Sequence, residues 1–163
     1  MEQYLYEAAE ISSSIWWQST EKCLILRDLR DTIALGKSIP QKLPNVKMLL
    51  LQGPLGAGKT SLVKGLAKSL GIQEPITSPT FALAQHYPNG NPPLIHLDLY
   101  RLENPKDADE LFIQEEEEAK AQGALIVVEW PERLSIALPE AWLITLKHWP
   151  KEGRLVQLIP PKT

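Results

Sequence analysis

The segment Gly53–Thr60, which reads GPLGAGKT, constrains this chain more than any other and fits the pattern G-x-x-x-x-G-K-[ST]. The apolar run Met48–Leu51 precedes it, and a stretch with helical periodicity begins at Lys59. In that context the glycines let successive backbone N–H groups point at phosphate oxygens, and the helix N-terminus adds positive potential. The pattern therefore predicts a phosphate-binding loop between a buried strand and a helix.

The individual positions of this loop have distinct expected roles. The Lys59 ammonium can neutralise the β- and γ-phosphates of a nucleotide, and the Thr60 hydroxyl can ligate Mg²⁺, which prefers oxygen ligands. The expected contacts with the nucleotide come from Gly53, Leu55, Gly56, Ala57, Gly58, Lys59, Thr60 and Ser61.

Two acidic residues each follow a run of apolar residues with strand character. Asp98 ends the segment Leu94–Asp98, and Glu129 ends the segment Leu125–Glu129. Because α/β proteins bind ligands at the carboxyl ends of their strands, both acids are candidates for catalysis and for Mg²⁺ binding. Each can ligate the metal or orient the attacking water, and the sequence leaves both roles open. His96 shares the face of Asp98 in a regular strand, as a polar contact near the site or as a structural histidine.

Residues 77–81, which read TSPTF, combine three hydroxyl-bearing side chains with a conformationally restricted proline. Such a segment can act as a switch in which Ser78 and Thr80 sense the γ-phosphate and the metal. The alternative is an ordinary turn that leads into a strand.

The prediction of which base the nucleotide carries rests mainly on motifs that the sequence lacks. Neither an N-K-x-D segment nor a D-x-x-G segment occurs in the chain, so the base-recognition apparatus of small GTPases is missing from the sequence. We therefore expect ATP as the nucleotide and Mg²⁺ as its metal.

The order of the remaining patterns predicts an α/β fold of three layers, resembling P-loop NTPases, with a mostly parallel central sheet and a C-terminal β-hairpin. Pro40 and Pro44 are expected to end the first helix, and Glu115–Glu118 to form a solvated helical face. The predicted strands span residues 24–26, 46–52, 80–87, 94–100, 125–129, 141–149 and 154–159. The predicted helices span residues 28–39 and 59–70, with a third that begins at residues 104–105.

Composition sets the broad class of the protein. The 163 residues are 44% apolar and contain one cysteine, which fits a single domain in a reducing compartment such as the cytoplasm. The longest clean apolar run, Ala124–Val128, is too short to span a membrane. We assign residues 1–21 to an N-terminal appendage, in which the pair Trp16-Trp17 resembles a packing or partner anchor, and residues 22–163 to the nucleotide-binding domain.

The net charge of −3 conceals two unlike halves. Residues 22–71 hold nine basic and two acidic side chains, whereas residues 72–140 hold four basic and thirteen acidic ones. The basic half contains the phosphate-binding loop, and the near-neutral total argues against a dedicated nucleic-acid-binding protein.

Four segments together resemble the TsaE (YjeE) family of small bacterial P-loop ATPases. They are LGAGKT at the loop, SPTF at residues 78–81, HLDLYRL at residues 96–102, and VEWPE at residues 128–132. The order and spacing of the segments also match, over about residues 24–160. Pro54 is a departure, because the family often has an acid after the first glycine of the loop, and we expect it to reduce loop flexibility.

The resemblance implies roles for specific residues. Lys59 and Thr60 would handle phosphate and Mg²⁺, Asp98 and Glu129 would be the key acids, and Ser78 and Thr80 would belong to the switch. The tryptophan after the glutamate, Trp130, would lie near the nucleotide. A T-x-x-L-G pattern in the helix before the loop would lie beside the base, here Thr32, Leu35 and Gly36.

The resemblance also implies a function. The family is needed for the threonylcarbamoyl modification of adenosine 37 in tRNA, so we expect a slow ATPase that associates with TsaD-like and TsaB-like proteins. Contact with tRNA would be indirect, through that complex. Two other functions stay open, a small-molecule kinase and a nucleotide-gated interaction module with negligible catalysis.

Overall fold

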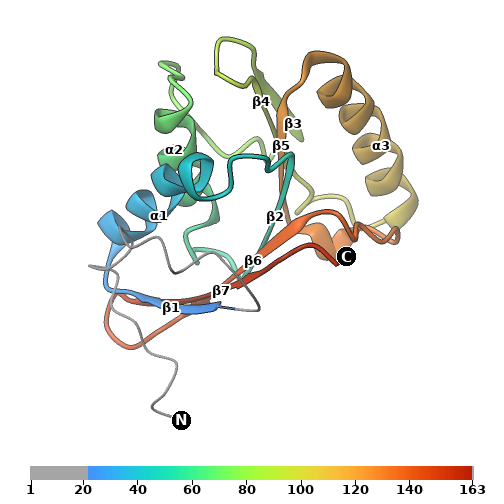
Figure 1. Cartoon of the computed structure of the whole chain (residues 1–163). Coiled ribbons are helices and arrows are strands. Elements are labelled where there is room, and N and C mark those ends of the chain that lie inside the picture. Colours follow the sequence, from blue (N-terminus) through green and yellow to red (C-terminus); the bar gives the residue numbers. More distant parts are fainter. Residues whose placement is uncertain (1–21, 163) are drawn as a thin grey trace.

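The computed structural model describes residues 22–162, which form one sheet covered by helices on both faces (Figure 1). The helices are α1 (Leu29–Lys42), α2 (Lys59–Ser69) and α3 (Pro105–Gln122), with a short 3₁₀ helix η3 (Pro131–Arg133). The strands are β1 (Lys22–Leu26), β2 (Met48–Gln52), β3 (Ala84–Tyr87), β4 (Leu94–Asp98), β5 (Leu125–Glu129), β6 (Trp142–His148) and β7 (Arg154–Ile159).

The seven strands lie in the order β1-β7-β6-β2-β5-β4-β3. The four central strands, β6, β2, β5 and β4, are parallel to one another, whereas β1, β7 and β3 pair antiparallel at the two sides. The predicted C-terminal hairpin is present as β6 and β7, and β1 extends it as a third strand. The predicted α/β class with a parallel centre is therefore confirmed.

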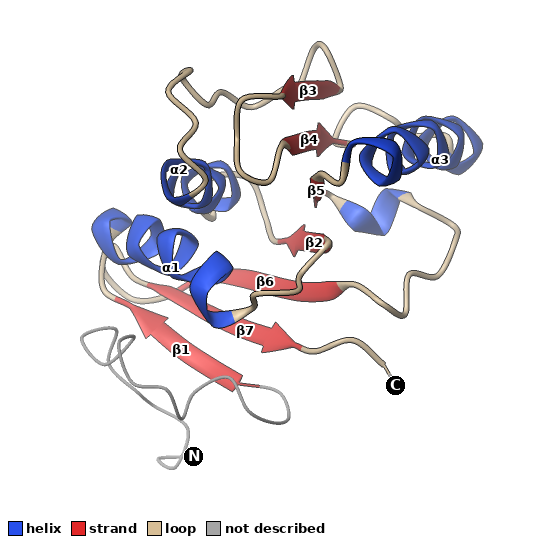
Figure 2. Cartoon of the chain, turned by 45° about the horizontal axis from the view of Figure 1, so that its top comes forward, coloured by secondary structure: helices blue, strands red, loops and turns tan. Residues whose placement is uncertain are grey.

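The helices form the outer layers of a three-layer arrangement. Figures 1 and 2 show α1 and α2 side by side on one face of the sheet and α3 on the other. Each face has its own hydrophobic core: one includes Leu35, Leu62 and Leu66 from α1 and α2, and the other includes Phe112 from α3. The continuous apolar character of β4 and β5 follows from burial on both faces.

Two glycines bring α1 and α2 unusually close together. A Cβ atom at Gly36 would lie 2.0 Å from the Leu62 carbonyl oxygen, and one at Gly65 would lie 2.0 Å from the Ile33 carbonyl oxygen. Only glycine fits at either position, so the two helix backbones are in contact and hold the start of α2 against α1.

The expectation that Pro40 ends the first helix is wrong. Helix α1 continues through Pro40 to Lys42, and Leu43 takes a non-helical conformation with φ −124° and ψ 68°. Pro40 lies in the last turn, where the missing N–H costs a single hydrogen bond. Pro44 is the effective stop, because a residue that precedes proline is disfavoured in the helical region.

Several predicted strands are longer than the observed ones. The strand predicted for residues 80–87 begins only at Ala84, because Leu83 has a positive φ of 66° that interrupts the extended backbone. The strand predicted for residues 94–100 ends at Asp98, and the strand predicted to start at residue 46 starts at Met48. The hairpin strands differ from the prediction by one residue or not at all.

The acidic run Glu115–Glu118 is not a uniformly solvated face. Glu115 shares the buried side of α3 with Phe112 and Ala119, and its Oε2 lies 2.6 Å from His86 Nε2 on β3. Helical periodicity explains this, because positions 112, 115 and 119 recur on one side of the helix. The remaining acids of the run are outside that contact.

The predictions for residues 1–21, including the anchor role of Trp16-Trp17, lie outside the described residues. Within residues 22–162, no helix combines the length and apolar character needed to cross a membrane.

Candidate functional site

The loop between β2 and α2 has the backbone conformation that its glycines permit. Gly56 and Gly58 have positive φ angles of 74° and 104°, which other residues adopt only with strain. A Cβ atom at Gly53 would lie 2.4 Å from the Leu146 carbonyl oxygen, so the start of the loop touches β6. The loop therefore wraps closely against the sheet before α2 begins at Lys59.

The loop borders a cavity of about 230 Å³ at the carboxyl ends of the parallel strands. Residues 55–61 line it together with Asp98, Glu129, Trp130 and Tyr100. Most of the predicted nucleotide and metal contacts thus meet at one place, and Tyr100 is a lining residue that the sequence did not single out. Gly53, Thr32, Ser78 and Thr80 lie outside the lining.

The Lys59 side chain is folded over the loop. Its Nζ donates to the carbonyl oxygens of Gly53 and Pro54 at 2.5 and 3.0 Å, and lies 4.5 Å from the centre of a Trp130 ring. Burial lowers the pKa of the Lys59 ammonium, and the negative charges of Glu129, Glu132 and Asp98 oppose that shift. The ammonium thus has two carbonyl oxygens as its hydrogen-bond acceptors at the mouth of the loop.

Trp130 is held at the site by an unusual backbone. Its φ of 60° is positive, and its N–H donates to the Leu51 carbonyl oxygen at 3.2 Å. The side chain packs against Tyr100, with ring centres 4.9 Å apart. A bulky residue in this conformation is strained, and such strain concentrates at functional sites.

Glu129 is a buried acid that joins the loop to the sheet. Its Oε1 accepts from the Thr60 hydroxyl at 2.9 Å and lies 2.9 Å from His96 Nε2. Because a carboxylate accepts, His96 carries its proton on Nε2. The other ring nitrogen, His96 Nδ1, has no hydrogen-bond partner among residues 22–162. His96 is fully buried, so its ring is committed to holding this acid.

Asp98 lies beside Glu129 and holds the TSPTF segment. The two acids are directly paired across β4 and β5. The Asp98 carboxylate accepts from the Ser78 and Thr80 hydroxyls at 2.6 and 3.2 Å, and from the Tyr100 N–H at 3.0 Å. The predicted switch hydroxyls are therefore bonded to one of the two predicted metal-binding acids.

The T-x-x-L-G residues of α1 divide into two groups. Thr32 is buried beside the loop, with its Cγ2 3.4 Å from where a Cβ atom of Gly58 would be. Leu35 belongs to the hydrophobic core, and Gly36 allows α1 to approach α2. The pattern thus positions the helix pair that supports the loop.

Arg154, the first residue of β7, is a loop contact that sequence reasoning missed. Its Nε donates to the Ala57 carbonyl oxygen at 2.9 Å and its Nη2 to the Gly56 carbonyl oxygen at 3.0 Å. No local signal marks this residue, because nearly one hundred positions of chain separate it from the loop. Only the pairing of the C-terminal hairpin with the sheet brings the two together.

The donors at the cavity fit a hard cation such as Mg²⁺. They are oxygen atoms of Thr60, Asp98 and Glu129, and Mg²⁺ usually takes one or two carboxylates together with substrate phosphates. Within the described part of the chain, no group of three or more His, Cys, Asp or Glu side chains is arranged to hold a metal ion. A Mg²⁺ ion held by these residues would take its remaining ligands from water or from phosphate oxygens.

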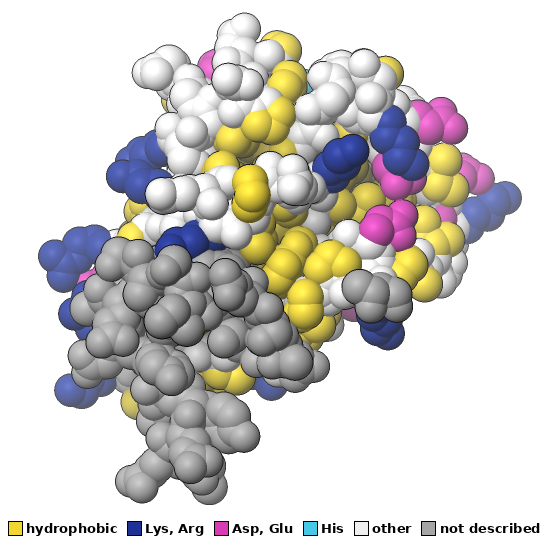
Figure 3. All heavy atoms as spheres, in the orientation of Figure 1, with side chains coloured by type: hydrophobic (Ala, Val, Ile, Leu, Met, Phe, Trp, Pro, Cys, Tyr) yellow, Lys and Arg dark blue, Asp and Glu magenta, His cyan; other side chains and the backbone are white. Residues whose placement is uncertain are grey.

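A second cavity, of about 530 Å³, opens at the opposite ends of the strands. Val46, Met48, Ala124, Ile126 and Trp142 supply apolar lining, and Figure 3 shows hydrophobic side chains gathered on this face. None of the predicted site residues lines this cavity. The three predicted catalytic residues, Lys59, Asp98 and Glu129, line the smaller cavity.

Comparison with known proteins identifies relatives of the chain. The family model described as "Threonylcarbamoyl adenosine biosynthesis protein TsaE" matches residues 26–156. The chain is 46% identical over 110 residues to the tRNA threonylcarbamoyladenosine biosynthesis protein TsaE of Synechocystis sp., covering 67% of this chain and 69% of that protein. It is 40% identical over 139 residues to the protein of the same name from Nostoc sp., covering 85% of each.

A solved structure supports the fold. The crystal structure of Bacillus subtilus YdiB superposes with a TM-score of 0.64 and 25% sequence identity, covering 88% of each chain. The likeness therefore covers most of the length of both chains.

Proposed function

This chain belongs to the TsaE family, and from that premise we propose that it acts in threonylcarbamoyladenosine formation at position 37 of tRNA. Its part would be to bind Mg²⁺ and ATP and to hydrolyse the ATP slowly. It would do so through nucleotide-dependent association with TsaD-like and TsaB-like proteins. Family membership supports the pathway, and the site geometry supports the nucleotide chemistry.

The observation that carries the nucleotide proposal is the convergence on Glu129. A single buried carboxylate oxygen meets the Thr60 hydroxyl of the loop and the His96 ring of the neighbouring strand, each at 2.9 Å. A glycine-rich turn that binds no nucleotide would not need a buried acid such as Glu129 next to the first turn of the helix that follows it. Burying such a charge costs free energy unless it is paired and hydrogen-bonded.

Hydrolysis requires charge stabilisation at the phosphates and a positioned water. Lys59 and the N–H groups at the start of α2 would stabilise negative charge on the transferred phosphoryl group. Glu129 or Asp98 would accept a hydrogen bond from the attacking water and orient it. Bound Mg²⁺ would neutralise phosphate charge, and Thr60 with the two acids would hold it directly or through water.

Asp98 offers a route from nucleotide to partner proteins. The Ser78 and Thr80 hydroxyls donate hydrogen bonds to its carboxylate. Phe81 follows Thr80 in the chain, and its side chain is 84% exposed. The guanidinium carbon of Arg101 lies 4.0 Å from the centre of the Phe81 ring. A change in the ligands of Asp98 would release or retain these hydroxyls and so move an exposed aromatic group. We propose that this segment changes between the ATP and ADP states and controls association with partner proteins.

The test is nucleotide binding and turnover by purified protein. Titration calorimetry with ATP and Mg²⁺ measures affinity, and phosphate release measures hydrolysis. We expect Lys59→Ala and Glu129→Gln each to lower hydrolysis about a hundredfold or more. Lys64→Ala is the matched control, because Lys64 is an exposed lysine one turn further along α2.

Two results would contradict the proposal. Hydrolysis at the wild-type rate by Lys59→Ala and Glu129→Gln would remove the site from catalysis. Faster phosphoryl transfer to a nucleoside or metabolite than to water, in a parallel screen, would indicate a kinase instead.

A further inference from the structure

We propose that Arg154 is a positioning residue that holds the phosphate-binding loop in its binding conformation before nucleotide arrives. The proposal rests on the nucleotide-binding function argued above, and it assigns the C-terminal hairpin a part in that function. It predicts that the hairpin sets the affinity of the loop for phosphate without touching the phosphate.

Four hydrogen bonds fix the Arg154 guanidinium between the loop and its own turn. Nε and Nη2 donate to the Ala57 and Gly56 carbonyl oxygens, and Nη1 donates to the carbonyl oxygens of Glu152 and Gly153 at 3.1 and 2.8 Å. The planar guanidinium presents donors in a rigid fork, so it can hold two adjacent carbonyl groups at once. No carboxylate takes part in these four bonds.

Because the peptide group is planar, hydrogen bonds to the carbonyl oxygens of Gly56 and Ala57 also fix the directions of the N–H groups that follow them. In a trans peptide the C=O group and the following N–H group point in opposite directions. A bond to the Gly56 oxygen therefore directs the Ala57 N–H away from the hairpin, where it donates to the Pro54 oxygen at 3.1 Å. A bond to the Ala57 oxygen likewise directs the Gly58 N–H away from Arg154. Both peptide groups adjoin the cavity of the site.

The anchor that presents Arg154 is itself firmly placed. Arg154 pairs with Leu26 of β1 on one side and with His148 of β6 on the other. The turn before it is closed by the Trp149 N–H, which donates to the Gly153 oxygen at 3.0 Å. A Cβ atom at Gly153 would lie 3.1 Å from the Leu26 oxygen, so this backbone is closely packed.

The hairpin touches the loop at a second point. The backbone oxygen of Leu146, on β6, lies 2.4 Å from where a Cβ atom of Gly53 would be. The start of the loop is thus held by β6, and its middle is held by Arg154 of β7. Contacts at both points with the same hairpin restrict the peptide groups of the loop that lie between them.

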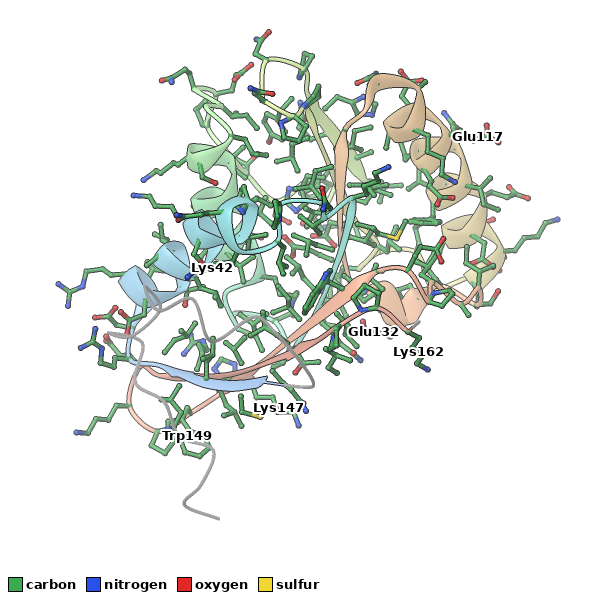
Figure 4. The ribbon with its side chains drawn as sticks, in the orientation of Figure 1. Lys42, Glu117, Glu132, Lys147, Trp149 and Lys162 are labelled. Carbon is green, nitrogen blue, oxygen red and sulfur yellow. The ribbon has the colours of Figure 1, made fainter. Side chains whose placement is uncertain are left out.

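The first test measures the loop without nucleotide. Amide hydrogen exchange at Ala57 and Leu62 reports opening of the loop, because their N–H groups donate to the Pro54 and Gly58 oxygens. We expect Arg154→Gln to raise the exchange rate at Ala57 about tenfold. Lys147→Gln is the control, since it removes the same charge from an exposed position of the same hairpin, labelled in Figure 4.

The second test distinguishes the hydrogen bonds that the Arg154 guanidinium donates to the loop from simple attraction by its positive charge. Arg154→Lys keeps the positive charge, but an ammonium group cannot reproduce the two-pronged contact with adjacent carbonyls. We expect both Arg154→Lys and Arg154→Gln to raise KM for ATP about tenfold while kcat changes less than about twofold, the pattern of lost uniform binding. Lys147→Gln should leave both constants unchanged.

Each outcome bears on the proposal differently. Unchanged exchange at Ala57 in Arg154→Gln, or full recovery of affinity in Arg154→Lys, would overturn it. Loss of cooperative unfolding in both Arg154 variants would assign the residue to folding and also overturn it. Absence of ATP binding by the wild-type protein would defeat the proposed function. The exchange rates would still test whether Arg154 holds the conformation of the loop.

Discussion

The Thr60 hydroxyl donates to Glu129 across 2.9 Å, joining the first turn of α2 to the end of β5. The two residues lie 69 positions apart in the chain. Parallel pairing of β2 with β5 creates the contact, because Leu51, at the end of β2, is directly opposite Glu129. The loop hydroxyl and the acid are therefore brought together by the sheet itself.

His96 should control the rate of hydrolysis more than the affinity for ATP. Replacing it in His96→Leu removes the donor to Glu129 Oε1 and leaves a buried acid less well oriented. A hydrogen bond to a charged group is worth about 1.5–3 kcal/mol, so we expect kcat to fall about tenfold or more. KM for ATP should change less than about twofold, as measured by steady-state kinetics.

Two further variants make the His96 prediction specific. His96→Gln retains an N–H donor and should recover part of the lost kcat. His86→Leu removes another histidine bonded to a glutamate, but that pair joins β3 to α3. An equal loss of kcat in His86→Leu would show that the effect is general destabilisation.

The hydroxyls of Ser78 and Thr80 should tether the TSPTF segment to Asp98. The double variant Ser78→Ala, Thr80→Ala removes both bonds to the carboxylate, at 2.6 and 3.2 Å. We expect amide exchange across residues 77–83 to rise about threefold to tenfold in nucleotide-free protein. Ser69→Ala, which removes a hydroxyl bond within α2, should leave that segment unaffected. Equal exchange in all three proteins would rule out the tether.

Gly36 should be intolerant of even the smallest side chain. In Gly36→Ala the new methyl group would meet the Leu62 carbonyl oxygen at 2.0 Å, so α1 must move away from α2. We expect the free energy of unfolding to fall by about 2 kcal/mol or more. Lys37→Ala, at the exposed neighbouring position, should change it by less than about 0.5 kcal/mol. Urea denaturation measures both, and similar values would contradict the close helix packing.

Asp31 should contribute stability that acid removes. Hydrogen bonds from Arg27 to the Asp31 carboxylate, at 2.8 and 3.1 Å, lower the pKa of that carboxyl below its ordinary 3.8. The stabilisation is complete above the unfolded-state pKa and is lost as pH falls through the lower folded-state value. We expect Asp31→Asn to cost about 1 kcal/mol at pH 7 and progressively less below pH 3.8. A difference in unfolding free energy that stays constant with pH would refute this assignment.

The sequence predicted which residues would meet at the smaller cavity better than it predicted the boundaries of the helices and strands. The phosphate loop, Asp98 and Glu129 carry local signals: a glycine pattern in one case, and an acid after an apolar run in the others. Parallel strands must bring such positions to the same edge of a sheet. Their meeting at one cavity therefore follows from the fold class.

Other features depend on tertiary contacts that no local pattern encodes. Helical periodicity places Glu115 on the inner side of α3, but its partner, His86, comes from a strand distant in the chain. Arg154 reaches Ala57 only after β7 has paired with β6 and β1. The sequence alone does not determine which strands are neighbours in the sheet, and these contacts depend on that order.

Reconstitution of tRNA modification tests the central claim most directly. Purified TsaD-like and TsaB-like proteins, tRNA, ATP and the threonylcarbamoyl donor system are incubated with this chain, with its Lys59→Ala variant, or without it. We predict that the modified nucleoside accumulates over many turnovers only with the wild-type chain. Equal accumulation with the chain omitted, or with Lys59→Ala in its place, would contradict the account.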